Sequence, residues 1–119
     1  MNPVTHVTIN PYFKCNEGKL AEFKALLPQF VEKTATEPAC HYYGFTINGD
    51  VIFCREGYEG AEGLLAHLGN VGPLLEQGLA ISELIRLEVH GPEAELAKLR
   101  EPLADLNPDW FVHECSVEK

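Results

Sequence analysis

The sequence predicts an α+β fold in which one antiparallel sheet carries two helices on a single face. Three observations support this prediction: a hairpin near the middle of the chain, a helical pattern on each side of it, and alternating apolar residues at both ends of a core at residues 4–90. Asn48-Gly49-Asp50 separates the two hairpin runs, which are rich in aromatic and β-branched residues. Asn-Gly between such runs is a strong hairpin signal, because both central residues can adopt a positive φ.

The first strand is expected at residues 4–13 and the first helix at residues 19–34. Apolar residues alternate in the strand and recur at steps of three and four in the helix, which directs one face of each element toward the core. The residues expected on these faces are Val7, Ile9, Phe13, Leu20, Phe23, Leu27, Phe30, Val31 and Thr34. Pro11 removes a backbone donor, so we expect a bulge or a sheet edge near it.

The second strand of the hairpin is apolar on both sides. Val51 and Phe53 alternate with Ile52 and Cys54, so each side of the sheet carries large apolar groups. Two helices cannot cover both faces, and an exposed apolar sheet face is typical of an association surface. We therefore expect a homodimer whose sheets face each other.

The second helix is expected to begin at Gly60, and His67 lies near its end. Its apolar stripe consists of Ala61, Leu64, Leu65 and Leu68. We expect His67 to border this stripe without lying at its centre, so that His67→Ala costs no more stability than an ordinary point mutation, about 1 kcal/mol. Glycine and proline in residues 69–78 predict a helix break at Gly69 and a new turn at Pro73. That break is interpreted either as a lid or ligand entrance beside His67, or as a plain connector.

A fourth strand is expected at residues 81–90, followed by a C-terminal extension at residues 91–119. Within the extension we expect a helix that starts at Pro92 and a short strand from residue 110 to 117. The order is β-α-β-β-α-β with a helix and a strand appended, which is the ferredoxin-like arrangement. The length of 119 residues predicts a single domain, 1–119.

Composition narrows the range of partners. The net charge is −9, and such a surface repels phosphate backbones, so we expect no nucleic-acid partner. There is no apolar run long enough to span a membrane and no leader pattern at the N-terminus, so we expect no membrane partner and a cytoplasmic location. The four cysteines form no C-x-x-C pair, and we expect free thiols.

Motifs of common enzyme classes are missing from the sequence. It contains no G-x-G-x-x-G, Walker loop, H-E-x-x-H or G-x-S-x-G, so dinucleotide, ATP and α/β-hydrolase chemistry are not expected. A metal site would require His6, His41 and His67 to converge from separate elements, and we expect no metal.

His67 is the leading candidate for chemistry, because a histidine with an ordinary pKa near 6.5 suits a general base at neutral pH. The candidate catalytic residues are His67, Asn10 and Tyr43. The candidate substrate-binding residues are Tyr58, Glu56, Phe45 and Leu64. We expect the polar members to converge at the seam between the second helix and the sheet, as in an apolar pocket with a few directed polar groups. Other roles remain open: His67 as a structural histidine, the tyrosines as core aromatics, and Glu56 as an ion-pair partner of Arg55 or Arg86.

Several of these residues form a recognisable pattern. It comprises Glu37-Pro38-Ala39-Cys40, Tyr43, Glu56-x-Tyr58, Ala61 and His67-Leu68. Over roughly residues 4–90 this pattern resembles the antibiotic-biosynthesis-monooxygenase-like family of dimeric α/β-barrel proteins. A glycine is usual in that family where this chain has Ala39. The resemblance implies the ferredoxin-like fold and the face-to-face homodimer.

The resemblance also implies a function. Relatives include monooxygenases that use no cofactor and act on a small aromatic molecule of the phenol or quinol type. Such a reaction needs a base, donors for the developing oxyanion and a dry cavity. The same side chains would suffice for binding a small ligand without catalysis. A haem-binding relative is a third possibility, although the only tryptophan, Trp110, lies outside the matching region.

Overall fold

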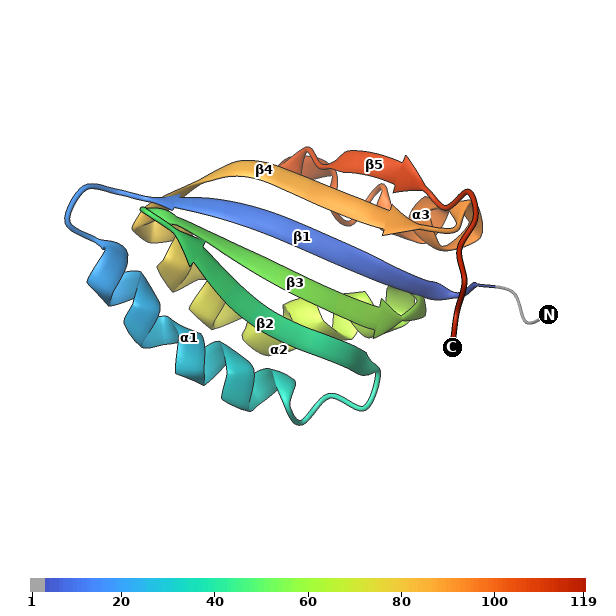
Figure 1. Ribbon diagram of the computed structural model, residues 1–119, viewed down its shortest axis with the longest axis horizontal. Helices are drawn as coiled ribbons and strands as arrows, with labels where there is room; N and C mark the ends of the chain where they lie inside the picture. The colour runs from blue at the N-terminus through green and yellow to red at the C-terminus, as the bar shows by residue number, and fades with distance from the viewer. Residues whose placement is uncertain (1–3) are drawn as a thin grey trace.

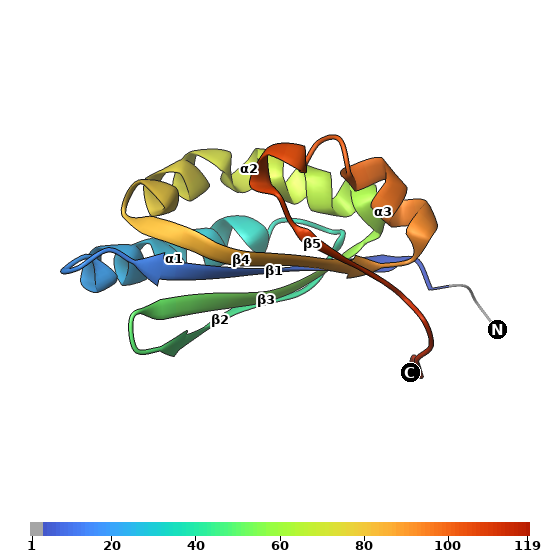
Figure 2. The same ribbon diagram turned by 90° about the horizontal axis from the view of Figure 1, so that it is seen from above.

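The computed structural model describes residues 4–119 and contains one five-stranded sheet with its two long helices on one face (Figures 1 and 2). The elements are β1 (His6–Cys15), α1 (Leu20–Thr34), β2 (Cys40–Asn48), β3 (Val51–Glu59), α2 (Gly60–Ala80), β4 (Ser82–Gly91), α3 (Glu93–Leu99), η1 (Ala104–Leu106) and β5 (Asp109–Val112). The strand order is β2-β3-β1-β4-β5, antiparallel except for the parallel pair β4 and β5. The predicted ferredoxin-like α+β fold with an appended helix and strand is therefore confirmed.

Strand β1 lies in the middle of the sheet, between β3 and β4. Pro11 therefore does not mark a sheet edge. The register with β4 shifts between Tyr12 and Phe13, so the other expected outcome, a bulge near Pro11, is the one observed. Val7, Ile9 and Phe13 are buried on the helix side, as their alternation predicts.

The hairpin of β2 and β3 turns at Gly49-Asp50. Asn48 pairs with Val51 inside the ladder, so the turn lies one residue later than an Asn-Gly turn would. Gly49 has a φ of 61°, and Asp50 has a negative φ. This arrangement matches a two-residue turn in which only the first central residue needs the left-handed region, a position that favours glycine.

Helix α2 is continuous from Gly60 to Ala80, so the predicted break at Gly69 and new turn at Pro73 are wrong. The second half of the helix is held by packing, because Val71 and Leu74 are buried against α1. Gly78 also allows close approach, since a Cβ there would lie 3.1 Å from Cζ of Phe23. Tertiary contacts thus offset the helix-propensity cost of about 1 kcal/mol per glycine and about 3 kcal/mol for proline. Because the helix continues through residues 69–78, this segment is neither the lid or ligand entrance nor the plain connector that its composition suggested.

Helix α1 buries a slightly different face from the one predicted. Phe23, Phe30 and Thr34 are buried as expected, but Leu26 is also buried and Val31 is 46% exposed. Apolar residues are so frequent in this helix that two neighbouring stripes fit the three- and four-residue spacing. Packing against Val71 and Leu74 of α2 selects the stripe that contains Leu26.

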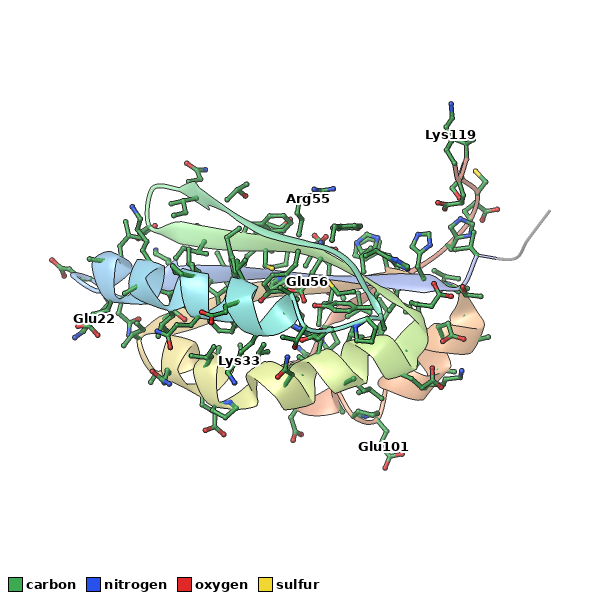
Figure 3. The ribbon with its side chains drawn as sticks, turned by 90° about the horizontal axis from the view of Figure 1, so that it is seen from below. Glu22, Lys33, Arg55, Glu56, Glu101 and Lys119 are labelled. Atoms are coloured by element: carbon green, nitrogen blue, oxygen red, sulfur yellow. The ribbon has the colours of Figure 1, made fainter. Side chains whose placement is uncertain are left out.

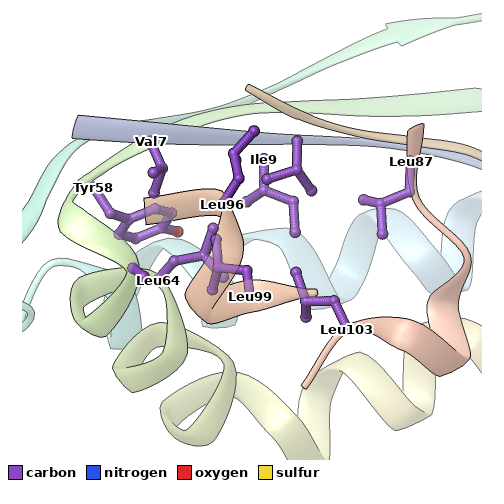
Figure 4. Packing of buried hydrophobic residues seen from close by; sticks show 10 residues of the cluster. Val7, Ile9, Tyr58, Leu64, Leu87, Leu96, Leu99 and Leu103 are labelled. Carbon is purple, nitrogen blue, oxygen red and sulfur yellow. The ribbon is translucent and has the colours of Figure 1, made fainter. Parts of the chain in front are cut away.

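The C-terminal extension closes one end of the core. Leu96, Leu99 and Leu103 are fully or almost fully buried and pack with Tyr58 and Leu64 of the βαββαβ unit (Figure 4). Strand β5 ends at Val112, so it is shorter than the strand predicted at residues 110–117. Within residues 4–119, none of the helices is both long enough and apolar enough to cross a membrane.

Candidate functional site

His67 lies in the centre of the buried face of α2, not at its border. Its exposed fraction is only 2%, and Leu64 and Val71, one turn to either side, are buried as well. Steps of three and four residues place all three side chains on the face that contacts the sheet. The expectation that His67 borders the stripe is therefore wrong, and its imidazole needs polar partners within the protein.

Two carboxyl groups supply these partners. Nδ1 of His67 lies 2.9 Å and 3.0 Å from the two carboxyl oxygens of Glu37, in the connection between α1 and β2. Nε2 lies 3.4 Å from Oε1 of Glu56 on β3. Asn70, one turn after His67, donates from Nδ2 to Oε2 of Glu37 at 2.8 Å and to the Lys33 carbonyl at 3.0 Å. The imidazole thus lies between two acids, one of which is held by a neighbouring amide.

Glu56 is a buried acid. Its side chain points from β3 toward the helices, whereas that of Arg55 points to the opposite face (Figure 3). Burial raises the pKa of Glu56 to about 7, although hydrogen bonds from Tyr58 and Cys54 act in the opposite direction. The Tyr58 hydroxyl donates to Oε1 of Glu56 at 2.6 Å. Arg55 lies over the ring of Tyr42, so it is not an ion-pair partner of Glu56.

Arg86, the other proposed ion-pair partner of Glu56, is also engaged elsewhere. Its Nε lies 2.6 Å from Glu88, and its Nη1 lies 3.5 Å from Asp109. The ion-pair interpretation of Glu56 is therefore wrong for both arginines.

Burial lowers the pKa of His67, because the charged imidazolium loses its contact with water. The hydrogen bond and the negative charge of Glu37 partly offset this effect. Near neutral pH a neutral imidazole therefore faces a Glu56 carboxyl that is protonated in a large fraction of molecules. A base and an acid whose environments move their pKa values in opposite directions are typical of acid–base sites.

Two tyrosine rings enclose the imidazole. The ring centroids of Tyr43 and Tyr58 lie 5.1 Å and 5.0 Å from that of His67. Burial is the main cause that raises the pKa of both phenols, so both remain protonated. The aromatic walls exclude water on two sides of His67 and strengthen its interactions with the acids.

A narrow cavity lies beside this cluster, between the sheet and helices α1 and α2. Its volume is about 50 Å³, counted as the space open to the centre of a water-sized sphere. Apolar side chains from both helices and from β1, β2 and β4 form most of its wall, and Tyr43, Cys54, Glu56 and His67 supply the polar groups. An apolar cavity with a few convergent polar groups is the usual form of a small-ligand site.

Some of the residues singled out in the sequence meet at this cavity. His67, Glu56, Tyr43 and Phe45 line it. Tyr58 does not line it, but its hydroxyl donates a hydrogen bond to Glu56, which does.

Two further candidates do not line the cavity. Asn10 alternates with the inward residue Ile9 and lies on the other face of the sheet, where Thr8 donates to its Oδ1 at 3.3 Å. Leu64 is fully buried in the core cluster and does not line the cavity. Asn10 as a catalytic residue and Leu64 as a contact in the cavity are therefore corrected.

Two residues of the site were missed. Glu37 was noticed only as part of the motif Glu37-Pro38-Ala39-Cys40, and Asn70 fell in the segment at residues 69–78 where the helix was expected to break. A carboxylate next to a strand and an amide one turn after a candidate histidine are weak signals, because nothing local shows that they meet. The three histidines considered as metal ligands do not converge, since His6 and His41 lie together outside the core.

Comparisons with known proteins agree with this architecture. No family model matches the sequence, and no curated protein matches it either. Among solved structures, MupZ from Pseudomonas fluorescens is 42% identical, with a TM-score of 0.94 over 100% of this chain and 93% of that one.

More distant solved structures match only part of the chain. An antibiotic biosynthesis monooxygenase has a TM-score of 0.62 and 17% identity over 70% of this chain and 92% of its own. A proposed antibiotic biosynthesis monooxygenase from Caulobacter crescentus has a TM-score of 0.65 and 20% identity over 72% of this chain and 88% of its own. At these identities the likeness is one of fold, while the similarity to MupZ extends to sequence over the full length. The chain therefore belongs to the same family as MupZ, and it shares the fold of the antibiotic biosynthesis monooxygenases.

Proposed function

We propose that this chain is a cofactor-independent enzyme that transfers protons at a small, largely apolar substrate. The observation that carries the proposal is the pair formed by His67 and Glu56. It places a neutral base and an acid that is partly protonated near neutral pH 3.4 Å apart, both buried, in the wall of an apolar cavity. A low-dielectric site of this kind strengthens each charge that develops during a reaction.

The surrounding residues suit distinct roles. With its Nδ1–H donating to Glu37, neutral His67 carries its lone pair on Nε2, on the side of Glu56 and the cavity. If Nε2 takes a proton, the Glu37 carboxylate stabilises the resulting imidazolium, as the acid does in a catalytic triad. Glu56, with a pKa of about 7, can return a proton near neutral pH.

The likeness in fold to antibiotic biosynthesis monooxygenases favours oxygenation as the reaction that uses these proton transfers. In this proposal His67 removes a proton from a phenol or quinol, and the electron-rich anion reduces dioxygen. One oxygen atom enters the product and the other leaves as water, for which Glu56 supplies a proton. The substrate is the only reductant, so electrons balance without a flavin or a metal.

Haem binding is supported less well. A haem would require a space far larger than the cavity.

Oxygen uptake tests the proposal. Purified protein, treated with a chelator and free of flavin, should consume oxygen when a hydroquinone or polyketide phenol is added. His67→Gln should reduce the rate at least tenfold, and His41→Gln, a histidine at the surface, should not. Tight binding of such compounds with no turnover by the wild-type protein would contradict catalysis and favour a non-catalytic binding protein.

We also propose that the protein is a cytoplasmic homodimer formed through the sheet face that the two long helices leave uncovered (Figure 2). Aromatic groups gather on this face: the rings of Tyr12 and Phe53 lie 4.6 Å apart, and Tyr42 is stacked under Arg55. Light scattering should give the mass of a dimer, and Phe53→Asp should shift it toward the monomer. A monomeric mass at every concentration of the wild-type protein would contradict the dimer.

A further inference from the structure

One buried hydroxyl group has no partner within the protein. Among the side chains of residues 4–119, Oγ1 of Thr34 is the single buried nitrogen or oxygen atom without a hydrogen bond. Thr34 is the last residue of α1 and is only 3% exposed. A threonine in a helix often donates to the carbonyl one turn earlier, here that of Phe30, but Thr34 does not. Buried polar groups in native proteins are nearly always paired, so this hydroxyl indicates a bound water or ligand atom.

The unpaired hydroxyl lies beside the cavity. Thr34 follows Phe30 by four residues, so the two side chains share one face of α1, and Phe30 lines the cavity. Tyr43 of β2 lines it as well. Burial is the largest effect on the pKa of Tyr43 and raises it, while the nearby Thr34 hydroxyl acts in the opposite direction. Two hydroxyl groups from different elements thus meet at the cavity without a hydrogen bond of ordinary geometry between them.

The chemistry of the two hydroxyls restricts the atom that can bind to both. Each of them can donate one hydrogen bond and accept others. Because burial raises the pKa of Tyr43, its phenol remains a neutral donor. An anion is disfavoured by the Glu56 carboxyl, which lies close enough to act on the same phenol, and by the net charge of −9. A neutral oxygen atom that accepts a hydrogen bond from each hydroxyl therefore fits best.

This pair of hydroxyls lies next to the candidate base. The ring centroids of Tyr43 and His67 are 5.1 Å apart, and both residues line the cavity. A small aromatic molecule that places one hydroxyl at Nε2 of His67 therefore brings the rest of its ring close to Tyr43. A phenol with a single oxygen atom would leave Thr34 unpaired, whereas a quinol carries a second oxygen that would satisfy it.

We propose that the hydroxyls of Thr34 and Tyr43 form a second polar subsite, which binds the second hydroxyl of a quinol-type substrate. Thr34 is then a specificity-determining residue that favours substrates with two oxygen atoms over phenols with one. A site built to hydrogen-bond a substrate hydroxyl discriminates against an analogue without it, because buried polar groups of the protein are then left unpaired. The inference rests on the proposed function only where it assigns the first hydroxyl to His67.

Binding of matched ligands to the full chain tests the subsite, in the absence of oxygen so that no turnover occurs. The pairs are hydroquinone with 4-methylphenol and catechol with 2-methylphenol, since a methyl group replaces one hydroxyl at nearly constant size. In NMR titrations the wild-type protein should bind the diol about fivefold or more tightly than the methylphenol in at least one pair. Equal affinities within both pairs, or no binding of either diol, would overturn the inference.

Variants of Thr34 test which residue causes this preference. Thr34→Val removes the hydroxyl but keeps the branched shape, so it should bind the diol less tightly and lose most of the preference. Thr34→Ser retains a hydroxyl and should retain the preference. Thr36→Val is the matched control, because Thr36 is exposed and its hydroxyl already donates to the Lys33 carbonyl at 2.7 Å. Wild-type preference in folded Thr34→Val would overturn the inference, and Tyr43→Phe provides the same test if that variant fails to fold.

Urea unfolding distinguishes a ligand oxygen from a resident water. Thr34→Val should be at least as stable as the wild-type protein, because a methyl group replaces an unpaired hydroxyl. A variant that loses stability and keeps the wild-type preference would show that Thr34 holds a structural water, which overturns the inference. Selective binding of a diol without oxygen uptake would reject the proposed oxygenase and leave the subsite intact. Oxygen uptake together with an unchanged preference in Thr34→Val would do the reverse.

Discussion

The protein contains the same chemical pair, a histidine and a glutamate, in two different environments. Inside the core, Nδ1 of His67 lies 2.9 Å from Glu37, and the two side chains are 3% and 10% exposed. At the surface, Nε2 of His41 lies 3.0 Å from Glu59, and the side chains are 46% and 56% exposed. The distances are almost equal, so any difference in behaviour comes from the surroundings.

The surroundings change which physical effect dominates. At the surface, hydrogen bonds from Thr5 and His41 lower the pKa of Glu59, and water and salt screen the pair. In the core, burial is the largest effect on His67, and it lowers the pKa of the histidine in spite of Glu37. Contact geometry alone therefore does not identify a reactive histidine; contact geometry together with burial does.

The largest difference between the two pairs should appear when each histidine is removed. His67→Ala leaves two carboxyl groups buried without their partner, which should cost about 2–4 kcal/mol of unfolding free energy. This cost exceeds the value of about 1 kcal/mol expected when His67 was placed at the border of the stripe. Turnover or ligand affinity per folded molecule should fall at least tenfold. Urea unfolding and oxygen uptake measure the two effects, and His41→Ala should change neither; equal stability of the two variants would contradict the role of burial.

The second prediction concerns the pH dependence of stability, through Glu56. The folded protein holds this proton up to a pKa of about 7, whereas the unfolded chain releases it near 4.5, so stability should fall as pH rises between these values. The loss is on the order of 3 kcal/mol by pH 8. His67 acts with the opposite sign, because its lowered pKa costs stability as pH falls below 6.5.

Glu56→Gln should remove the loss of stability between about pH 4.5 and 7 and be more stable than wild type at pH 8, as measured by urea unfolding across pH 4.5–8. The surface variant Glu59→Gln should keep the wild-type decline between pH 5 and 7. A wild-type curve that does not decline over this range would mean that Glu56 is ionised in the folded protein.

The fold could be predicted well from the sequence, because strands and helices each have a characteristic spacing of apolar residues. The alternation of β1 even implied that Asn10 lies opposite Ile9, on the face away from the helices, so its assignment to the site conflicted with that pattern. The continuity of α2 was not predictable in this way, since it depends on contacts of Val71, Leu74 and Gly78 with α1.

The candidate site was predictable only in part. His67 and Glu56 lie on regular elements and could be placed by spacing. Glu37 and Asn70 contact across 33 residues of sequence, and Glu37 lies in a connection whose path no periodicity describes. The acid that orients His67 was therefore visible as a motif residue but not as a partner.

The third prediction separates the two glutamates that pair with histidine. Glu37→Gln removes the negative charge that raises the pKa of His67, so the acid limb of the pH–rate profile should move to lower pH. The rate at the optimum should fall about tenfold, equivalent to roughly 1.4 kcal/mol, because the imidazolium loses its stabilising carboxylate. Glu59→Gln is the matched control and should leave the profile unchanged. A Glu37→Gln enzyme with the wild-type rate and profile would show that Glu37 has no part in the chemistry.

The smallest expected effect tests whether the buried pair of His67 and Glu37 depends on Asn70. Asn70 donates to Glu37 at 2.8 Å and to the Lys33 carbonyl at 3.0 Å, so it acts on His67 only by positioning Glu37. Asn70→Ala should cost about 1 kcal/mol of stability and lower kcat a few-fold with little change in KM.

Asn70→Asp distinguishes positioning from simple packing. It places a second negative charge beside Glu37, which should raise the pKa of His67 and move the acid limb to higher pH, opposite to the shift expected for Glu37→Gln. A residue that served stability alone would change the unfolding curve in both Asn70 variants and leave the acid limb where it is in the wild-type enzyme.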